Sequence, residues 1–192
     1  MLLYDLPNKK IIIGDSRVET RYLLDRSVHL VVTSPPYFSI KDYGVENQIG
    51  FGQSYEQYLY DLRNIFYECY RALYPGCKLC INIGDQYLSA KEHGRHRFLP
   101  LAADIIGIVV GLGFDYMGDI IWRKIGTTKT TGGGAWMGSI YYPRDGQITQ
   151  EYEHILIFKK PGKSPKPTKE AKEASRLTKE ERQYWFRSFW ED

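Results

Sequence analysis

Short apolar, β-branched runs that end in polar loops, with helical segments between them, constrain the fold of this chain most. Residues 10–13 (KIII) end at a GDS tripeptide, and residues 28–33 (VHLVVT) end at SPPY. Runs of this kind are typical of buried parallel strands whose carboxyl ends open into loops. Between them, SRVETRYLLDRS is long enough for a short crossover helix. The pattern predicts an α/β sheet with helices on its faces.

The rest of the chain continues this alternation. Residues 55–74 carry apolar side chains at spacings of three and four, after a capping-box pattern at Ser54 and Gln57, and Pro75-Gly76 supplies a stop. The further predicted elements are a helix at 98–112 and strands at 78–84, 117–124 and 153–160. Because no helix separates the last two strands, we expect them to pair antiparallel at one edge of the sheet.

Length and composition favour one domain with a tail. The chain has 192 residues, a formal net charge of +3 and a pI near 8.6, which permit a polyanionic partner without requiring one. No apolar stretch approaches the roughly 18 to 20 residues that span a bilayer. The first residues, MLLYDLPNKK, do not have the pattern of a signal peptide. We therefore expect a cytoplasmic protein without a membrane partner.

The three cysteines, Cys69, Cys77 and Cys80, are few and odd in number, as expected for reduced thiols. Cys77 and Cys80 form a CxxC pair, but no second pair exists and their segment has the pattern of a strand. Small buried side chains are the expected role, and no metal site is predicted.

The prolines after the strand at 28–33 create an unusual site. Each proline fixes φ and pushes the residue before it, Ser34 or Pro35, toward extended geometry. The Ser34 hydroxyl and the Pro35 carbonyl are therefore rigid acceptors, and Tyr37 presents a flat face beside them. Ligands of open α/β sheets bind at such carboxyl ends. The arrangement suits a planar heterocycle with an exocyclic amino group, although Tyr37 could instead be a core residue.

The segment TSPPYF resembles the catalytic motif of amino-methylating DNA methyltransferases, written D/N/S-P-P-Y/F in that family, and its serine form is most typical of the cytosine-N4 enzymes. The segments IIIGDSRVETRYLLDRSVHLVVTSPPYFSIKDYG, LYPGCKLCINIGD, DIIWRK and YEHILIFKKPGK resemble successive family blocks in the permuted order, over most of residues 10–163. The resemblance implies a partial Rossmann-like, S-adenosylmethionine-dependent methyltransferase sheet with an antiparallel edge strand.

By resemblance, the catalytic residues are Ser34, Pro35, Pro36 and Tyr37. Hydrogen bonds to Ser34 and to the Pro35 carbonyl would free the lone pair of the cytosine amino nitrogen for direct attack on a sulfonium methyl group. The base must first be flipped out of the duplex, and stacking on Tyr37 would offset much of that cost. Cytosine-C5 methylation is set aside because it needs a Pro-Cys nucleophile, and no cysteine here follows a proline.

The implied methyl donor is S-adenosyl-L-methionine. The resemblance assigns Asp15, Thr33 and Asp85 to its pocket, with Asp15 accepting from the adenine amino group. A helix cap would explain Asp15 equally well.

Basic and aromatic residues suggest contacts with double-stranded DNA. Arg95 and Arg97 belong to the cluster KEHGRHR, which is otherwise explained as a solvated charge run. Lys129, Trp136 and Arg144 belong to residues 125–152, a long segment predicted to be a DNA-facing loop.

One family block is absent from this sequence. A glycine-rich FxGxG loop, which wraps the methionine part of the donor, follows the first strand of the family. The first two family strands are lacking with it. Residues 1–163 are therefore expected to be the catalytic-motif part. Residues 164–192 are expected to be a linker and an aromatic helix, capped by Thr178 and Glu181, that leads to the missing half. The KIII strand is then expected to have no neighbour, and the SPPY strand to form an exposed apolar edge. These features suggest a truncated or split enzyme that needs a complementary polypeptide.

The leading hypothesis is a site-specific DNA (cytosine-N4) methyltransferase of a restriction–modification system. The enzymatic alternative is adenine-N6 methylation. A non-catalytic DNA-binding remnant is the alternative from another class, and it predicts DNA affinity without donor binding. An unrelated α/β domain with a chance SPPY turn predicts that Tyr37→Ala changes only stability.

Overall fold

The computed structural model describes residues 2–6, 9–124, 148 and 150–191. Its centre is a mixed five-stranded sheet with the strand order β3-β4-β8-β7-β9. The strands of this sheet are β3 (Val28–Thr33), β4 (Leu73–Ile83), β7 (Asp115–Arg123), β8 (Tyr152–Lys159) and β9 (Phe189–Glu191). β3 runs parallel to β4, and β8 runs antiparallel to both β4 and β7. The predicted α/β architecture and the antiparallel pairing of the last two predicted strands are therefore confirmed, but this pair does not lie at the edge of the sheet as predicted, because β9 pairs with β7 and forms the edge.

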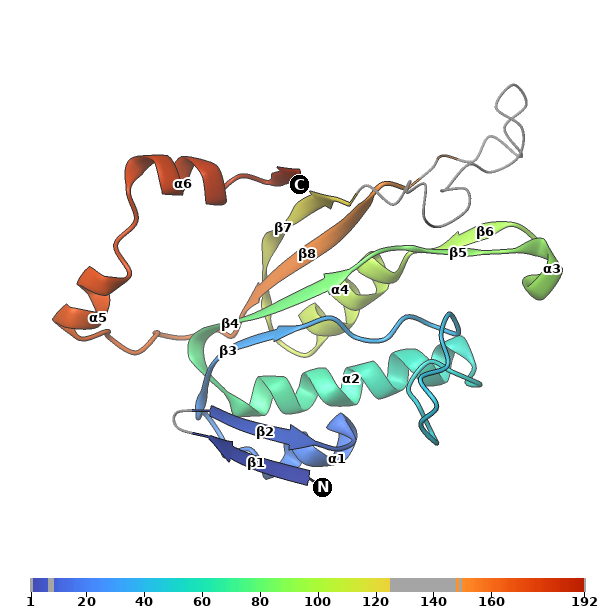
Figure 1. Cartoon of the computed structure of the whole chain (residues 1–192), viewed down its shortest axis with the longest axis horizontal. Coiled ribbons are helices and arrows are strands. Elements are labelled where there is room, and N and C mark those ends of the chain that lie inside the picture. The colour runs from blue at the N-terminus through green and yellow to red at the C-terminus, as the bar shows by residue number, and fades with distance from the viewer. Residues whose placement is uncertain (1, 7–8, 125–147, 149, 192) are drawn as a thin grey trace.

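Two helices bury one face of this sheet (Figure 1). They are α2 (Tyr55–Ala72) and α4 (Leu101–Gly111). Ser54 accepts from the Gln57 amide at the start of α2, as its sequence predicts. The fully buried side chains come from both helices and from alternate positions of β4 and β8, namely Tyr58, Leu62, Phe66, Leu79, Ile81, Ile83, Leu101, Ile105, Val109, Leu156 and Phe158. One continuous core therefore supports the carboxyl ends of β3 and β4.

Several element boundaries differ from the prediction. α2 passes directly into β4, so Pro75 and Gly76 lie inside that strand and do not form a stop. Gly76 can adopt its φ of +82° there because it has no side chain, and a Cβ would lie 2.3 Å from the Ser164 amide nitrogen. The second helix is shorter than predicted, because β6 (Arg97–Leu99) takes up its first residues.

The KIII segment is a strand with a neighbour, which corrects the prediction. β2 (Lys9–Ile13) pairs antiparallel with β1 (Leu2–Leu6) in a separate two-stranded ribbon. Its isoleucines are 40% to 52% exposed, so it is not a buried parallel strand. The short crossover after β2 is present as α1 (Ser16–Glu19) and the 3₁₀ turn η1 (Thr20–Tyr22).

The free edge of β3 agrees with the prediction. Within the described residues β3 pairs only with β4. Leu30 and Val32 are 56% and 71% exposed, whereas their neighbours Val31 and Thr33 lie closer to the core. An apolar strand edge of this kind is a ready pairing surface.

The end of the chain contains more elements than the predicted linker and aromatic helix. It forms α5 (Lys169–Ala174), α6 (Lys179–Trp185) and β9, and β9 pairs parallel with β7. The capping box of Thr178 and Glu181 is present, as predicted. Phe189 and Trp190, predicted to be helical, lie in β9. Tyr184, Trp185 and Phe186 stay more than half exposed, and Figure 1 places α5 and α6 away from α2.

A short hairpin extends beyond the carboxyl end of β4 (Figure 1). It consists of β5 (Gln86–Leu88), α3 (Ala90–His93) and β6, with β5 and β6 antiparallel. Within the described residues, no helix is long and apolar enough to cross a membrane.

Candidate functional site

The SPPY segment lies directly beyond the carboxyl end of β3. Ser34 is exposed and Pro35 is buried. Among the described residues, no hydrogen bond uses the Ser34 hydroxyl or the Pro35 carbonyl oxygen. Within this part of the chain both acceptors are therefore unpaired, on a backbone that prolines restrict.

The residues after these acceptors are held firmly in place. The hydroxyl of the fully buried Tyr58, on α2, donates to the Pro36 carbonyl at 2.8 Å. The Gly84 amide, at the end of β4, donates to the Tyr37 hydroxyl at 2.8 Å. A Cβ on Gly84 would lie only 3.1 Å from that hydroxyl oxygen, so the close approach favours glycine. The Tyr37 side chain thus links the ends of β3 and β4.

Two further hydrogen bonds hold the next turn. The side-chain amide of Gln86 donates to the Phe38 carbonyl, and the Ser39 amide donates to the Gly50 carbonyl at 2.6 Å. Gln86 is 4% exposed, and its Oε1 has no partner among the described residues. Gly50 has a φ of +86°, which glycine adopts without strain. The backbone from Pro36 to Ser39 is therefore preorganised.

Tyr37 is partly buried, and burial raises its pKa to about 12. The nearby carboxylate of Glu153 acts in the same direction, whereas the hydrogen bond from Gly84 opposes it. The phenol is therefore neutral at physiological pH. Its oxygen accepts from Gly84, and its partly exposed ring can meet a ligand.

Asp15 caps α1, one of its two predicted roles. Its carboxylate accepts from the Arg17 amide at 2.9 Å and pairs with the Arg17 guanidinium at 2.7 Å. These side-chain hydrogen bonds hold the pKa of Asp15 below its usual value. The Asp15 side chain is still 42% exposed, so its carboxylate can also accept from a ligand.

One open pocket of about 470 Å³ brings Asp15 and the SPPY motif together. Pro36 and Asp15 lie on its walls, although 21 positions separate them in the sequence. The apolar part of its lining consists of Ile13, Pro36, Tyr43, Val45 and Ile49. A carboxylate among exposed apolar groups suits a flat ring system that carries a hydrogen-bond donor.

Thr33 and Asp85 lie outside this pocket lining. Thr33 is the last residue of β3 and pairs with Ile81. Asp85 accepts from the Ala102 amide at 3.1 Å, in the first turn of α4. It therefore acts as a helix-capping group in this structure.

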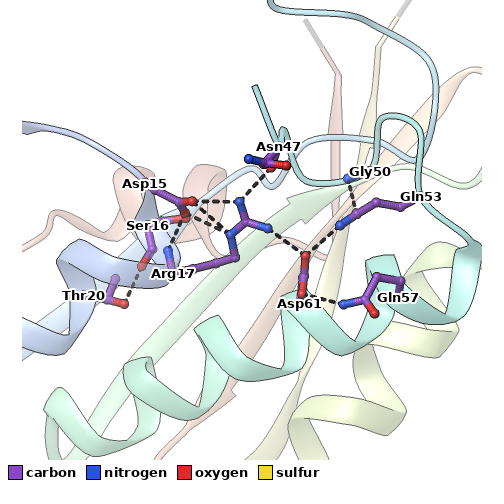
Figure 2. A network of polar contacts seen from close by, with 9 residues as sticks. All are labelled: Asp15, Ser16, Arg17, Thr20, Asn47, Gly50, Gln53, Gln57 and Asp61. Carbon is purple, nitrogen blue, oxygen red and sulfur yellow. Dashed lines mark hydrogen bonds and ion pairs between the residues drawn. The ribbon is translucent and has the colours of Figure 1, made fainter. Parts of the chain in front are cut away.

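Sequence reasoning missed a polar network around Arg17 and Asp61 (Figure 2). Arg17 joins Asp15 to Asp61 of α2, with Nη1 3.0 Å from Oδ2 of Asp61. Asp61 is 6% exposed, although it lies among the apolar positions of α2. A charged residue on the buried face of an amphipathic helix was the available signal, because buried charges need partners.

The predicted DNA contacts fall into two groups. Arg95 and Arg97 are exposed on the β5–α3–β6 hairpin, next to the aromatic stack of Tyr87 and His96. Lys129, Trp136 and Arg144, and most of the predicted 125–152 loop, lie outside the described residues. Of these five residues, the structure therefore describes only Arg95 and Arg97, which lie on the hairpin beyond the carboxyl end of β4.

The CxxC pair does not form a shared site in the described structure. Cys77 is buried and Cys80 is partly buried, and both are free thiols. Three positions apart in β4, they point to opposite faces of the sheet. No group of three or more His, Cys, Asp or Glu side chains within the described residues could hold a metal ion.

Solved structures identify the fold as that of S-adenosylmethionine-dependent methyltransferases. A protein from Thermus thermophilus, solved in complex with S-adenosyl-L-methionine, is 38% identical with a TM-score of 0.73, and the match covers 94% of this chain and 67% of that one. PvuII DNA methyltransferase (cytosine-N4-specific) has a TM-score of 0.55 at 19% identity over 78% of this chain and 49% of that one, which shows the shared fold alone.

The sequence model of the DNA methylase family matches residues 28–192. The chain belongs to this family. Among curated relatives, the Type II methyltransferase M.MjaI of Methanocaldococcus jannaschii is 35% identical over 96% of this chain. The chain spans 66% of the length of that relative.

Proposed function

We propose that this chain carries the base-binding part of a DNA methyltransferase that methylates the exocyclic N4 of a flipped cytosine, within a type II restriction–modification system. The observation that carries the proposal is the pair of acceptors on Ser34 and Pro35, which take part in no hydrogen bond among the described residues and lie beside Tyr37 and the pocket of Asp15. The serine form of the motif favours cytosine-N4 over adenine-N6.

The chain's own residues contribute positioning and electrostatics. The Ser34 hydroxyl and the Pro35 carbonyl accept the two amino hydrogens of the base, which draws them out of the ring plane and frees the nitrogen lone pair. The ring of Tyr37 stacks on the base, for about 1 to 3 kcal/mol. This contribution offsets much of the few kcal/mol needed to flip the base.

The residues of the Asp15 pocket fit the adenosine part of a methyl donor. Asp15 would accept from the adenine amino group, and the apolar wall of Ile13, Val45 and Ile49 would contact the ring. S-adenosyl-L-methionine would supply the sulfonium methyl group that the base nitrogen attacks, leaving a neutral thioether. The methylated nitrogen then loses one proton to water.

Double-stranded DNA is the proposed partner. Arg95 and Arg97 on the projecting hairpin would contact phosphates, which position a protein on DNA without specifying sequence. Lys129, Trp136 and Arg144 are proposed to contact DNA from the segment 125–152.

The exposed edge of β3 supports a second, donor-binding part of the enzyme. Strands that carry the FxGxG loop would pair with the open backbone edge of β3, beside the exposed Leu30 and Val32. That part would be further sequence of the same protein or a complementary polypeptide. The test adds a polypeptide with this half to the methylation assay and measures whether activity rises.

The primary experiment incubates the chain with S-adenosyl-L-methionine and unmethylated DNA, alone and with the donor-binding part of a relative. Nucleosides are then analysed by mass spectrometry. N4-methylcytosine that disappears in Ser34→Ala, and persists in the control Ser188→Ala, is the expected result; Ser188 is exposed between α6 and β9. N6-methyladenine in its place would keep the proposed mechanism but show that the target base is adenine and not cytosine. DNA binding without either product would favour a non-catalytic remnant.

A further inference from the structure

Arg17 lies at the junction of three segments that meet beside the proposed site. Its Nη2 donates to Asp15 Oδ2 and to the Asn47 carbonyl, both at 2.7 Å. Its Nη1 donates to Asp61 Oδ2 at 3.0 Å. One guanidinium therefore binds the helix α1 cap, the loop 39–53 and helix α2 together (Figure 2).

The network continues from Asp61 toward the SPPY motif. Asp61 accepts from the side-chain amides of Gln53 and Gln57, each at 2.9 Å. Gln53 in turn accepts from the Gly50 amide at 2.8 Å. Gly50 is the residue whose carbonyl receives the Ser39 amide, two positions after Tyr37. An unbroken chain of polar contacts thus joins Asp15 to the loop that follows the motif.

Burial gives this chain of contacts its strength. The Asp61 side chain is 9% exposed and that of Arg17 is 23% exposed, so water competes weakly for their ion pair. The planar fork of arginine can meet a carboxylate and further acceptors at once, which a lysine ammonium on a flexible stem does not reproduce. The geometry therefore depends on arginine in particular.

We infer that Arg17 is a positioning residue that couples the Asp15 carboxylate to the order of the loop 39–53, which lines the same proposed donor pocket and joins the SPPY motif to helix α2. The inference rests on the proposed function, because it takes Asp15 as a donor ligand. Arg17 orients the Asp15 carboxylate and fixes Asn47 with the same group. Donor binding at Asp15 then stabilises the loop, and an ordered loop favours donor binding, because coupling between two sites is reciprocal.

The test uses the full chain and S-adenosyl-L-homocysteine, the unreactive product, as the probe. Isothermal titration measures its affinity, and hydrogen exchange with mass spectrometry measures protection of residues 39–53 with and without the probe. The variants are Arg17→Met, Arg17→Lys and the control Arg63→Met. Arg63 is exposed on α2 and has no hydrogen bond or ion pair among the described residues.

We expect Arg17→Met to weaken probe binding about fivefold or more. It also raises exchange of 39–53 in the absence of the probe. Arg17→Lys does not restore either property, and Arg63→Met behaves as the wild type. The melting temperature of each variant separates these effects from global unfolding. If Arg17→Met fails to fold, Gln53→Met breaks only the link from Asp61 to Gly50 and is expected to raise exchange of the same loop.

A double-mutant cycle with Asp15→Asn distinguishes positioning from a purely structural role. If Arg17 acts in part through Asp15, Arg17→Met weakens binding by less in the Asp15→Asn background than in the wild type. An equal loss in both backgrounds contradicts the inference. So does unchanged affinity of Arg17→Met while the wild type binds. A wild type that binds no probe overturns the proposed donor site itself, and the inference with it.

Discussion

Replacing Gly50 with alanine tests whether the loop 39–53 supports the SPPY motif. Gly50 has a φ of +86°, and a Cβ there would lie 2.8 Å from the Tyr37 carbonyl oxygen and 3.2 Å from the Tyr58 ring. Gly52, in the same loop, has a φ of +71° with open space around a Cβ. Gly52→Ala is therefore a matched control that carries the backbone strain without the close contact.

Both variants lose about 1 to 2 kcal/mol from the left-handed backbone conformation. Only Gly50→Ala also forces an atom against the Tyr37 backbone carbonyl, which adds about 1 to 3 kcal/mol, as overpacking does. For a chain of this size, each kcal/mol lowers the melting temperature by about 2 to 4 °C.

Urea denaturation and thermal melting measure the difference between the two variants. Gly50→Ala is expected to be less stable than Gly52→Ala by about 1 to 3 kcal/mol, the cost of the close contact. It is also expected to lose more affinity for the methyl donor and for the base, because the Tyr37 carbonyl must move. Equal stability of the two variants would refute the reasoning, since it would mean that the Gly50 backbone does not press on the motif.

Three further predictions follow from buried groups. Tyr58→Phe leaves the Pro36 carbonyl unpaired and costs about 1 to 3 kcal/mol in urea denaturation, whereas Tyr60→Phe, on the exposed side of α2, changes little. Lys160 is 8% exposed and donates to carbonyls at the end of α2, so Lys160→Met should cost a similar amount, also by urea denaturation; no loss would argue against this cap. The folded pKa of Tyr37, about 12, lies above its ordinary value of 10.0. The stability that Tyr37 contributes through its neutral hydroxyl is therefore complete below pH 10 and is lost between pH 10 and 12. The free energy of unfolding should fall less steeply over this pH range in Tyr37→Phe than in the wild type. Parallel curves of unfolding free energy against pH would contradict the shift.

The sheet and its main helices could be predicted from local pattern because each depends on periodic burial. The residues of α2, β3, β7 and β8 keep their apolar spacing whatever surrounds them, and the Ser54 and Thr178 caps are local hydrogen bonds. Boundaries were less predictable where pairing overrides local preference. Pro75 and Gly76 lie inside β4, because strand pairing and the approach of Ser164 determine the backbone there.

The N-terminal ribbon shows how an isolated apolar run misleads. KIII has the composition of a buried strand, but its partner is β1, a short neighbouring segment, and the pair stays apart from the main sheet. Likewise, Phe189 and Trp190 continue the aromatic pattern of α6, yet pairing with β7 draws them into a strand. In both cases a hydrogen-bonding partner, which periodicity does not reveal, decided the element.

The rigid acceptors of the candidate site follow from local sequence, because two prolines restrict their own backbone and that of the serine before them. Their surroundings depend on the tertiary fold. It brought Asp15 and Pro36 to one pocket, joined the Tyr37 hydroxyl to Gly84, and placed Arg17 between Asp15 and Asp61. These contacts join residues far apart in the chain, and their distances depend on how α1 and α2 pack rather than on any local preference.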